Sequence, residues 1–372
     1  MLRPLATSVA AAALVAVLTL RCSETSAPPA PPAPSQRPQL ARPAIQAATT
    51  PTLTPQQSGT TNRLQAVSPA NEQVVWASGV GGTYTVTTDG GQTWRAGVVP
   101  GAETLQFRDV EGQSATVAYL LAAGPGDQSR IYRTEDGGQH WSLQFVNQDP
   151  DAFYDCFAFW HRQRAITMSD AVNGRFPVIR TNDGRRWTSI AERLPPAQPG
   201  EAAFAASGTC VATQGGDLAW IGTGGAARAR ILATIDGGNT WNAYDTPIVQ
   251  GTASSGVITV AFRDRLHGIL GGGELAQPDA FADNVARSSD GGRTWTLGTR
   301  TPFTGSVYGL SYVPGLGATV VVTGPKGAAW SSDDGGHWLT LEGVQNYWAV
   351  AFASQIAGWL VGTEGRIVKV SF

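Results

Sequence analysis

The chain has 372 residues, of which only 15% are charged, and it contains 45 Gly and 12 Trp. This composition argues against a helical bundle and favours many short strands joined by tight turns. A formal net charge of -2 provides no overall basic field, which argues against a protein that binds nucleic acid mainly through phosphate contacts.

The N-terminal 27 residues have the pattern of a secretory signal peptide. Arg3 precedes an apolar run over residues 6–20, and Thr25 and Ala27 are small residues that fit cleavage after position 27. We therefore expect an exported protein, periplasmic or secreted. Cys22 resembles a lipoprotein acceptor only loosely, because Arg21 stands where a small residue is expected. Association with a membrane through Cys22 stays an open alternative.

Residues 28–55 form a Pro-rich segment. Proline removes backbone donors and favours extended polyproline conformations that build no core, so we expect a linker here. The sequence accordingly predicts a signal peptide over 1–27, a linker over 28–55 and a single folded domain over 56–372.

One short phrase recurs along the folded part. TTDGGQTW ends at Trp94, and variants of it end at tryptophans 141, 187, 241, 295 and 338, with gaps of 43 to 54 residues. A period near this size indicates a propeller or another repeat array. Each unit contains four short apolar or alternating runs separated by Gly, Asn or Pro, the pattern of a four-stranded antiparallel meander.

A seventh unit begins at Asn346 and contains only three such runs. We expect its missing outer strand to come from residues 47–62, because closing the ring removes unpaired sheet edges. The fold class is therefore predicted to be all-β, a seven-bladed β-propeller of four-stranded antiparallel blades.

The recurring acids are predicted to be structural. An Asp carboxylate can accept bonds from the backbone N–H groups of a tight hairpin, the Gly permits unusual backbone angles, and the Trp packs between sheets. In the third unit Gly184 and Trp187 are in register, but Asn182 falls where the Asp is expected. The predicted structural residues are Asp89, Trp94, Asp136, Trp141, Trp187, Asp236, Trp241, Asp290, Trp295, Asp333 and Trp338.

These phrases are Asp-box, or BNR, motifs, and residues 60–372 resemble the BNR propellers of the photosystem II assembly and stability factor family, including the ending GWLVGTEGRI at Ile367. The resemblance implies a non-catalytic, monomeric platform that binds another envelope or membrane protein. Sialidases, xyloglucanases and sortilin-like receptors also carry Asp-boxes. A carbohydrate-active propeller is therefore the alternative function.

No motif for catalysis or for a bound group accompanies the repeat. The sequence contains neither HExxH nor paired CxxC, and neither GxSxG, a P-loop nor a dinucleotide fingerprint. We therefore expect no catalytic residue, no cofactor and no metal.

Two sets of polar residues are candidates for a binding site. The third unit concentrates six arginines, and the resemblance implies that an Arg-rich patch binds the partner; scattered solvated side chains are the alternative, because strand alternation can send them to different faces. A second set could meet at a propeller mouth for acid–base chemistry, with turn and capping roles as the alternative. The first set is Arg162, Arg164, Arg175, Arg180, Arg185 and Arg186; the second is Asp155, His161, Asp170, Glu201 and Asp217.

Two further features concern the same region. Cys156 and Cys210 lie at comparable points of neighbouring units, so we expect a disulfide in an exported protein, with two buried thiols as the alternative. Residues 191–204 and 272–285 break the period. We expect these insertions to determine specificity, because loops carry recognition.

Overall fold

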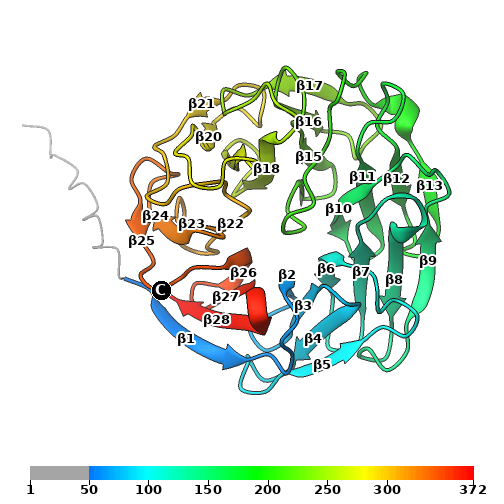
Figure 1. Ribbon diagram of the computed structural model, residues 1–372, viewed down its shortest axis with the longest axis vertical. Coiled ribbons are helices and arrows are strands. Elements are labelled where there is room, and N and C mark those ends of the chain that lie inside the picture. Colours follow the sequence, from blue (N-terminus) through cyan, green and yellow to red (C-terminus); the bar gives the residue numbers. More distant parts are fainter. Residues whose placement is uncertain (1–49) are drawn as a thin grey trace, which may run out of the picture. The chain divides into compact units, whose positions relative to one another are not determined.

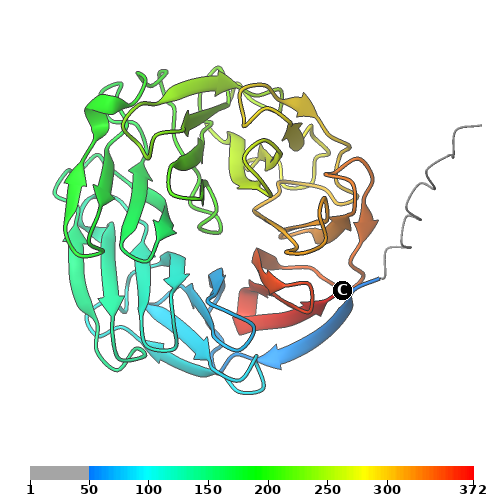
Figure 2. The ribbon, with the colours of Figure 1, turned by 180° about the vertical axis from the view of Figure 1, so that it is seen from behind.

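The fold is known from a computed structural model, which describes residues 50–372. The expected signal peptide, Cys22 and most of the expected linker lie outside the described residues. Seven four-stranded antiparallel sheets form a ring, as Figures 1 and 2 show from opposite sides. The prediction of an all-β, seven-bladed β-propeller is confirmed.

In six blades the four strands follow one another both in sequence and in the sheet. Blade 1 contains β2 (Leu64–Pro69), β3 (Val75–Gly79), β4 (Thr83–Thr87) and β5 (Arg95–Val98). Blade 2 contains β6 (Phe107–Gly112), β7 (Ala118–Ala122), β8 (Arg130–Thr134) and β9 (Ser142–Val146). Blade 3 contains β10 (Tyr154–His161), β11 (Arg164–Ser169), β12 (Val178–Thr181) and β13 (Trp187–Ser189).

The remaining blades of this kind follow the same order. Blade 4 contains β14 (Val211–Gln214), β15 (Leu218–Gly222), β16 (Arg230–Thr234) and β17 (Asn242–Asp245). Blade 5 contains β18 (Ser255–Phe262), β19 (Gly268–Glu274), β20 (Val285–Ser288) and β21 (Thr296–Leu297). Blade 6 contains β22 (Gly309–Tyr312), β23 (Val320–Gly324), β24 (Gly327–Ser331) and β25 (Leu339–Thr340).

Blade 7 closes the ring with strands from both ends of the described chain. It consists of β26 (Tyr347–Ser354), β27 (Ala357–Gly362), β28 (Arg366–Ser371) and, outermost, β1 (Thr52–Gln57). In the antiparallel pair of β1 with β28, Thr52 lies opposite Ser371 and Gln57 opposite Arg366. The outer strand thus comes from within residues 47–62, where the sequence placed it. β1 begins at Thr52, four residues before the expected start of the folded domain at residue 56, and so includes the end of the expected linker. Pro55 is compatible with this position because an outermost strand tolerates proline.

The apolar core lies between blades. Buried apolar side chains form seven clusters, each drawn mainly from two neighbouring blades. The cluster between blades 1 and 2 is typical. Trp76 of β3 is fully buried, and its indole N–H donates to the carbonyl of Ser114 in blade 2 at 2.9 Å. Packing between blades and such bonds together fix the angle of each sheet to the next.

The recurring acids hold the turns between the third and fourth strands. At Asp290, Oδ1 accepts the Ser288 hydroxyl at 2.8 Å and the Thr294 amide at 2.9 Å, while Oδ2 accepts the Thr294 hydroxyl at 2.7 Å. In four other blades Oδ1 of the acid likewise accepts a hydroxyl and a backbone amide, and Oδ2 meets a threonine hydroxyl at Asp89 and Asp236 but a histidine Nδ1 at Asp136 and Asp333. We call these and their equivalent in blade 3 the Asp turns.

The turn acid of blade 3 is Asp183, which corrects the expectation drawn from Asn182. Asp183 Oδ1 accepts the Thr181 hydroxyl at 3.0 Å and the Arg186 amide at 2.8 Å. This turn is one residue shorter than the others. Only Gly184 lies between the acid and the first amide that donates to it, whereas two residues lie there in a turn such as that of Asp236. Alignment on Gly184 therefore displaced the acid by one position.

The tryptophan that ends each turn packs toward the core. Trp141 lies 5.1 Å from the ring of Tyr84 and 6.1 Å from that of Trp76, both in the preceding blade. Trp241 and Trp295 are buried. The turn and its tryptophan therefore join local hairpin geometry to the contact between blades.

The ring has two different ends. The Asp turns and the hairpins between first and second strands lie at one end, which we call the turn face. The connections between second and third strands, and those from blade to blade, lie at the other, the loop face. In residues 50–372 the helices are the short 3₁₀ segments Gly126–Gln128, Ala191–Arg193 and Thr363–Gly365, and no helix there is long and apolar enough to cross a membrane.

Candidate functional site

A cavity of about 430 Å³ lies where the innermost strands begin at the loop face. Inner strands of successive blades contact one another around the axis, so their first residues converge there (Figure 1). We call this cavity the central cavity. Its polar and aromatic lining includes Arg63, Arg108, Asp155, Asp170, Tyr308 and Trp348.

One wall of the central cavity is cationic. The Arg63 guanidinium lies over the ring of Trp348, 5.1 Å from its centroid, and Trp348 meets Tyr308 edge to face at 5.4 Å. Arg108 donates to the carbonyl of Ala205 at 3.1 Å and to a neighbouring glutamine. Burial, followed by the charge of Arg63, lowers the pKa of Arg108, so the two cations lie close enough to repel each other.

A pair of carboxyl groups also lines the cavity, and one of them, Asp155, is close enough to Arg108 for their charges to interact. Asp155 is 1% exposed, and burial together with the neighbouring charge of Asp170 raises its pKa well above the usual range. Burial raises the pKa of Asp170 to about 6, although its Oδ1 accepts the Ala203 amide at 3.0 Å. Two adjacent carboxyls in a poorly solvated site favour sharing one proton. Near pH 6 the pair therefore retains a proton.

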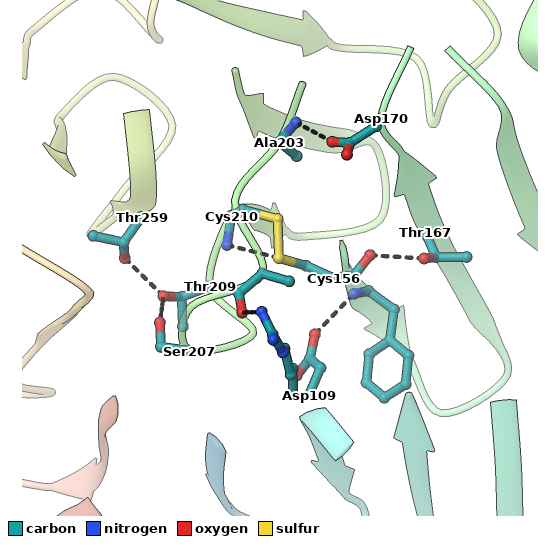
Figure 3. The surroundings of a disulfide bond; sticks show 12 residues. Asp109, Cys156, Thr167, Asp170, Ala203, Ser207, Thr209, Cys210 and Thr259 are labelled. Atoms are coloured by element: carbon teal, nitrogen blue, oxygen red, sulfur yellow. Dashed lines mark hydrogen bonds between the residues drawn. A yellow bond between two sulfur atoms is a disulfide. The ribbon is translucent and has the colours of Figure 1, made fainter. Parts of the chain in front are cut away.

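The connection from blade 3 to blade 4 forms the rim of the central cavity and is fixed at several points. A disulfide joins Cys156 of β10 to Cys210, just before β14, and Figure 3 shows its surroundings. Ser207 donates to the carbonyl of Tyr308 in blade 6 at 2.6 Å, and its hydroxyl lies 2.7 Å from that of Thr209. The rim thus bridges distant blades and is cross-linked to the strand that carries Asp155.

Both expected insertions lie at the loop face. Residues 202–206, from the first insertion and just after it, line the central cavity, as does Leu275 of the second. Lys326 forms an ion pair with Asp279 of the second insertion at 2.6 Å. The segments that break the repeat are therefore next to the cavity, which fits their expected role in specificity.

Two arginines of the expected patch serve the contact between blades 3 and 4. The Arg164 guanidinium lies 4.6 Å from the ring centroid of Trp160 and donates to the carbonyl of Gly237 at 2.5 Å. Arg180 donates to the same carbonyl at 3.1 Å. Both side chains therefore bind the Asp turn of the next blade.

Of the other four arginines, three lie at the turn face and one lies at the loop face. Arg185 pairs with Glu135 at 3.1 Å, and Arg162 lines the same small depression at the turn face. Arg186 lies in the adjacent Asp turn, whereas Arg175 lies in the connection between β11 and β12, at the loop face. The six arginines do not form one continuous patch, because successive connections of one blade lie at opposite ends of its strands.

The second expected set is also divided. Asp155 and Asp170 meet in the central cavity, but Glu201 is buried in an ion pair with an arginine of blade 4. His161 ends β10 and Asp217 precedes β15, which places both at the turn face. Among residues 50–372 no three His, Cys, Asp or Glu side chains gather as a metal site requires.

Sequence reasoning missed the cationic and aromatic wall. Arg63 and Tyr308 immediately precede an inner strand, and Arg108 and Trp348 are each the second residue of one. The repeat units were aligned on the Asp turns. An alignment of the units on the first residue of each inner strand would have placed these four residues at nearly the same position of the repeat.

The ring, its seven closed blades and the cavity at one mouth define a β-propeller. No model of a known protein family matches the chain, and no curated protein matches it. Among solved structures, YCF48 bound to a D1 peptide is similar with a TM-score of 0.61 and 16% identity, covering 90% of this chain and all of that chain.

Two further structures show the same likeness. YCF48 from Cyanidioschyzon merolae has a TM-score of 0.59 and 15% identity, covering 86% of this chain and 98% of that one. The GH74 xyloglucanase from Xanthomonas campestris has a TM-score of 0.57 and 13% identity, covering 85% of this chain but 53% of that one. At these identities the likeness establishes the propeller fold alone.

Proposed function

We propose that the chain is a non-catalytic platform that binds another protein at the loop face of its ring. The observation that carries the proposal is the central cavity, where Arg63 has no acidic partner among residues 50–372. Both insertions border this cavity. The likeness to a propeller bound to a D1 peptide supports protein binding as its use.

Rigidity suits this role. Closure by β1, the clusters between blades and the Asp turns leave little freedom in the ring, so a partner meets a preorganised surface. We assign the Asp turns to the Asp-box type and the chain to the BNR propellers. We also propose that it is exported as a monomer to the periplasm or beyond, and that its partner is another protein of the envelope or its membrane.

A carbohydrate-active function is the second candidate, because a xyloglucanase shares the fold. Glycosidases generally separate their two catalytic carboxyls by about 5–5.5 Å or about 6.5–9.5 Å. Asp155 and Asp170 are instead immediate neighbours that can share a proton. This arrangement favours binding over glycosidic cleavage.

The test is affinity capture from the native envelope fraction with the tagged mature protein. Three forms are compared: the parent, Arg63→Gln, and Arg186→Gln as a matched control that removes one arginine at the turn face. The proposal expects one protein to be retained by the parent and the control but lost by Arg63→Gln, with equal melting temperatures. Equal retention by all three contradicts a site at the loop face. Binding or cleavage on a glycan array without protein capture favours the second candidate.

A further inference from the structure

We infer that the central cavity recognises a carboxylate of the partner polypeptide, held between the guanidinium groups of Arg63 and Arg108. The inference rests on the proposed function and specifies which chemical group of the partner enters the ring.

The first argument is unused hydrogen-bonding capacity. A guanidinium has five N–H donors in a fixed fork. Those of Arg63 donate to no residue among 50–372, and its Nε is buried without a partner. Arg108 uses part of its capacity on the Ala205 carbonyl and on Gln106. The planar fork of arginine matches a carboxylate in two parallel bonds.

The second argument is charge. Arg63 and Arg108 are close enough for the charge of one to lower the pKa of the other, and their repulsion is stronger in a poorly solvated site than in water. Asp155 is close enough to Arg108 for their charges to interact, but the pair that it forms with Asp170 offsets the repulsion only in part while it keeps a proton. An anion placed between the guanidinium groups relieves the repulsion, so the cavity is complementary to a negative group.

The third argument distinguishes a polypeptide from an acidic sugar. Gln65 Oε1 is an amide acceptor that is buried in the cavity lining without a donor from residues 50–372, and a peptide carboxylate arrives with backbone N–H donors close to it. Trp348, which a sugar ring could otherwise stack on, already contacts Arg63 on its face and Tyr308. A volume of about 430 Å³ lies within the range of small-ligand sites. It therefore admits a side chain or a chain end, not a folded domain.

The experiment follows the arginine side chains directly. The mature chain, labelled with ¹⁵N-arginine, is titrated by NMR with three N-acetylated Gly/Ser pentapeptides, and the Nε–H signals of Arg63 and Arg108 are monitored. One peptide ends in a free carboxylate, the second is the same peptide amidated, and the third is amidated with one internal glutamate. The free terminus and the glutamate distinguish the two sources of a polypeptide carboxylate.

We expect saturable shifts with at least one acidic peptide, and binding by the uncharged amide weaker by about tenfold to a hundredfold, the usual effect of a charge-assisted bond. Arg63→Lys keeps the charge but loses the fork, so it should weaken binding, and Arg63→Gln should abolish it. If Arg63→Gln fails to fold, Arg108→Gln serves for the same measurement.

Equal binding of charged and uncharged peptides would overturn the inference. Glucuronate, an acidic sugar, is titrated in the same way, and the inference also fails if glucuronate binds more tightly than both acidic peptides and does so only when Arg63 is present. These failures differ from failure of the proposed function. Protein capture that depends on Arg63, combined with indifference to the carboxylate, refutes only the inference. If the parent and Arg63→Gln capture the same protein equally well, the loop-face platform itself is refuted.

Discussion

Removing the disulfide is expected to destabilise the whole ring by a predictable amount. Cys156 and Cys210 are 54 positions apart, and closing a loop of that length lowers the entropy of the unfolded chain by an amount worth about 4 kcal/mol. The folded part has about 320 residues, for which the entropy of unfolding is roughly 0.7 kcal/mol/K. The Cys156→Ala/Cys210→Ala double variant should therefore melt about 6 °C below the parent.

The assay is scanning calorimetry with and without a thiol reductant. The parent should lose a similar increment on reduction, and the double variant should be unaffected by the reductant. Limited proteolysis provides a local readout, because the disulfide fixes one end of the rim around residues 202–209, and cleavage there should accelerate in the variant. A change below about 2 °C, with unchanged cleavage, would refute the reasoning, since the contacts of Ser207 and Thr209 would then be sufficient to hold the rim.

Three further outcomes are expected. Asp290→Ala removes the acceptor of its Asp turn and should cost about 1–2 kcal/mol in urea unfolding, whereas Asp290→Asn should cost less. A chain starting at residue 58 lacks β1, leaves the edge of β28 unpaired and should melt at least about 10 °C lower or aggregate; an unchanged melting temperature would contradict ring closure by β1. Asp170 has a pKa raised to about 6, so its contribution to stability is present below about pH 4 and decreases as pH rises through 6. Melting curves from pH 4 to 8 should accordingly show Asp170→Asn gaining relative to the parent as pH rises, and a constant difference would refute the assignment.

The repeat was predictable because its structural signal is local. An Asp turn needs only its own acid, a hydroxyl residue two positions earlier and a glycine with positive φ, such as Gly90 and Gly184. Its tryptophan follows at nearly constant spacing. Even here spacing misled at Asp183, because in a turn that is one residue shorter Oδ1 of the acid still accepts the preceding hydroxyl and a backbone amide.

The arginines of blade 3 show why clustering in sequence did not predict a surface. Arg175 and Arg186 are eleven positions apart, yet one lies at the loop face and the other at the turn face. Arg164 and Arg180 are closer in space, but both bind the carbonyl of Gly237 in the next blade. Sequence proximity in a short antiparallel strand says little about which end of the ring a side chain reaches.

The sequence by itself determined the fold class, the number of blades, the source of the closing strand and the local chemistry of five of the six Asp turns, because each depends on contacts within a repeat or on the count of repeats. Only the tertiary structure decided the central cavity. Arg63, Arg108, Asp155, Tyr308 and Trp348 belong to five different blades or their connections, and closure of the ring brings them together. Burial at the common axis then changes the pKa of Asp155 and of Arg108, an effect that no isolated repeat contains.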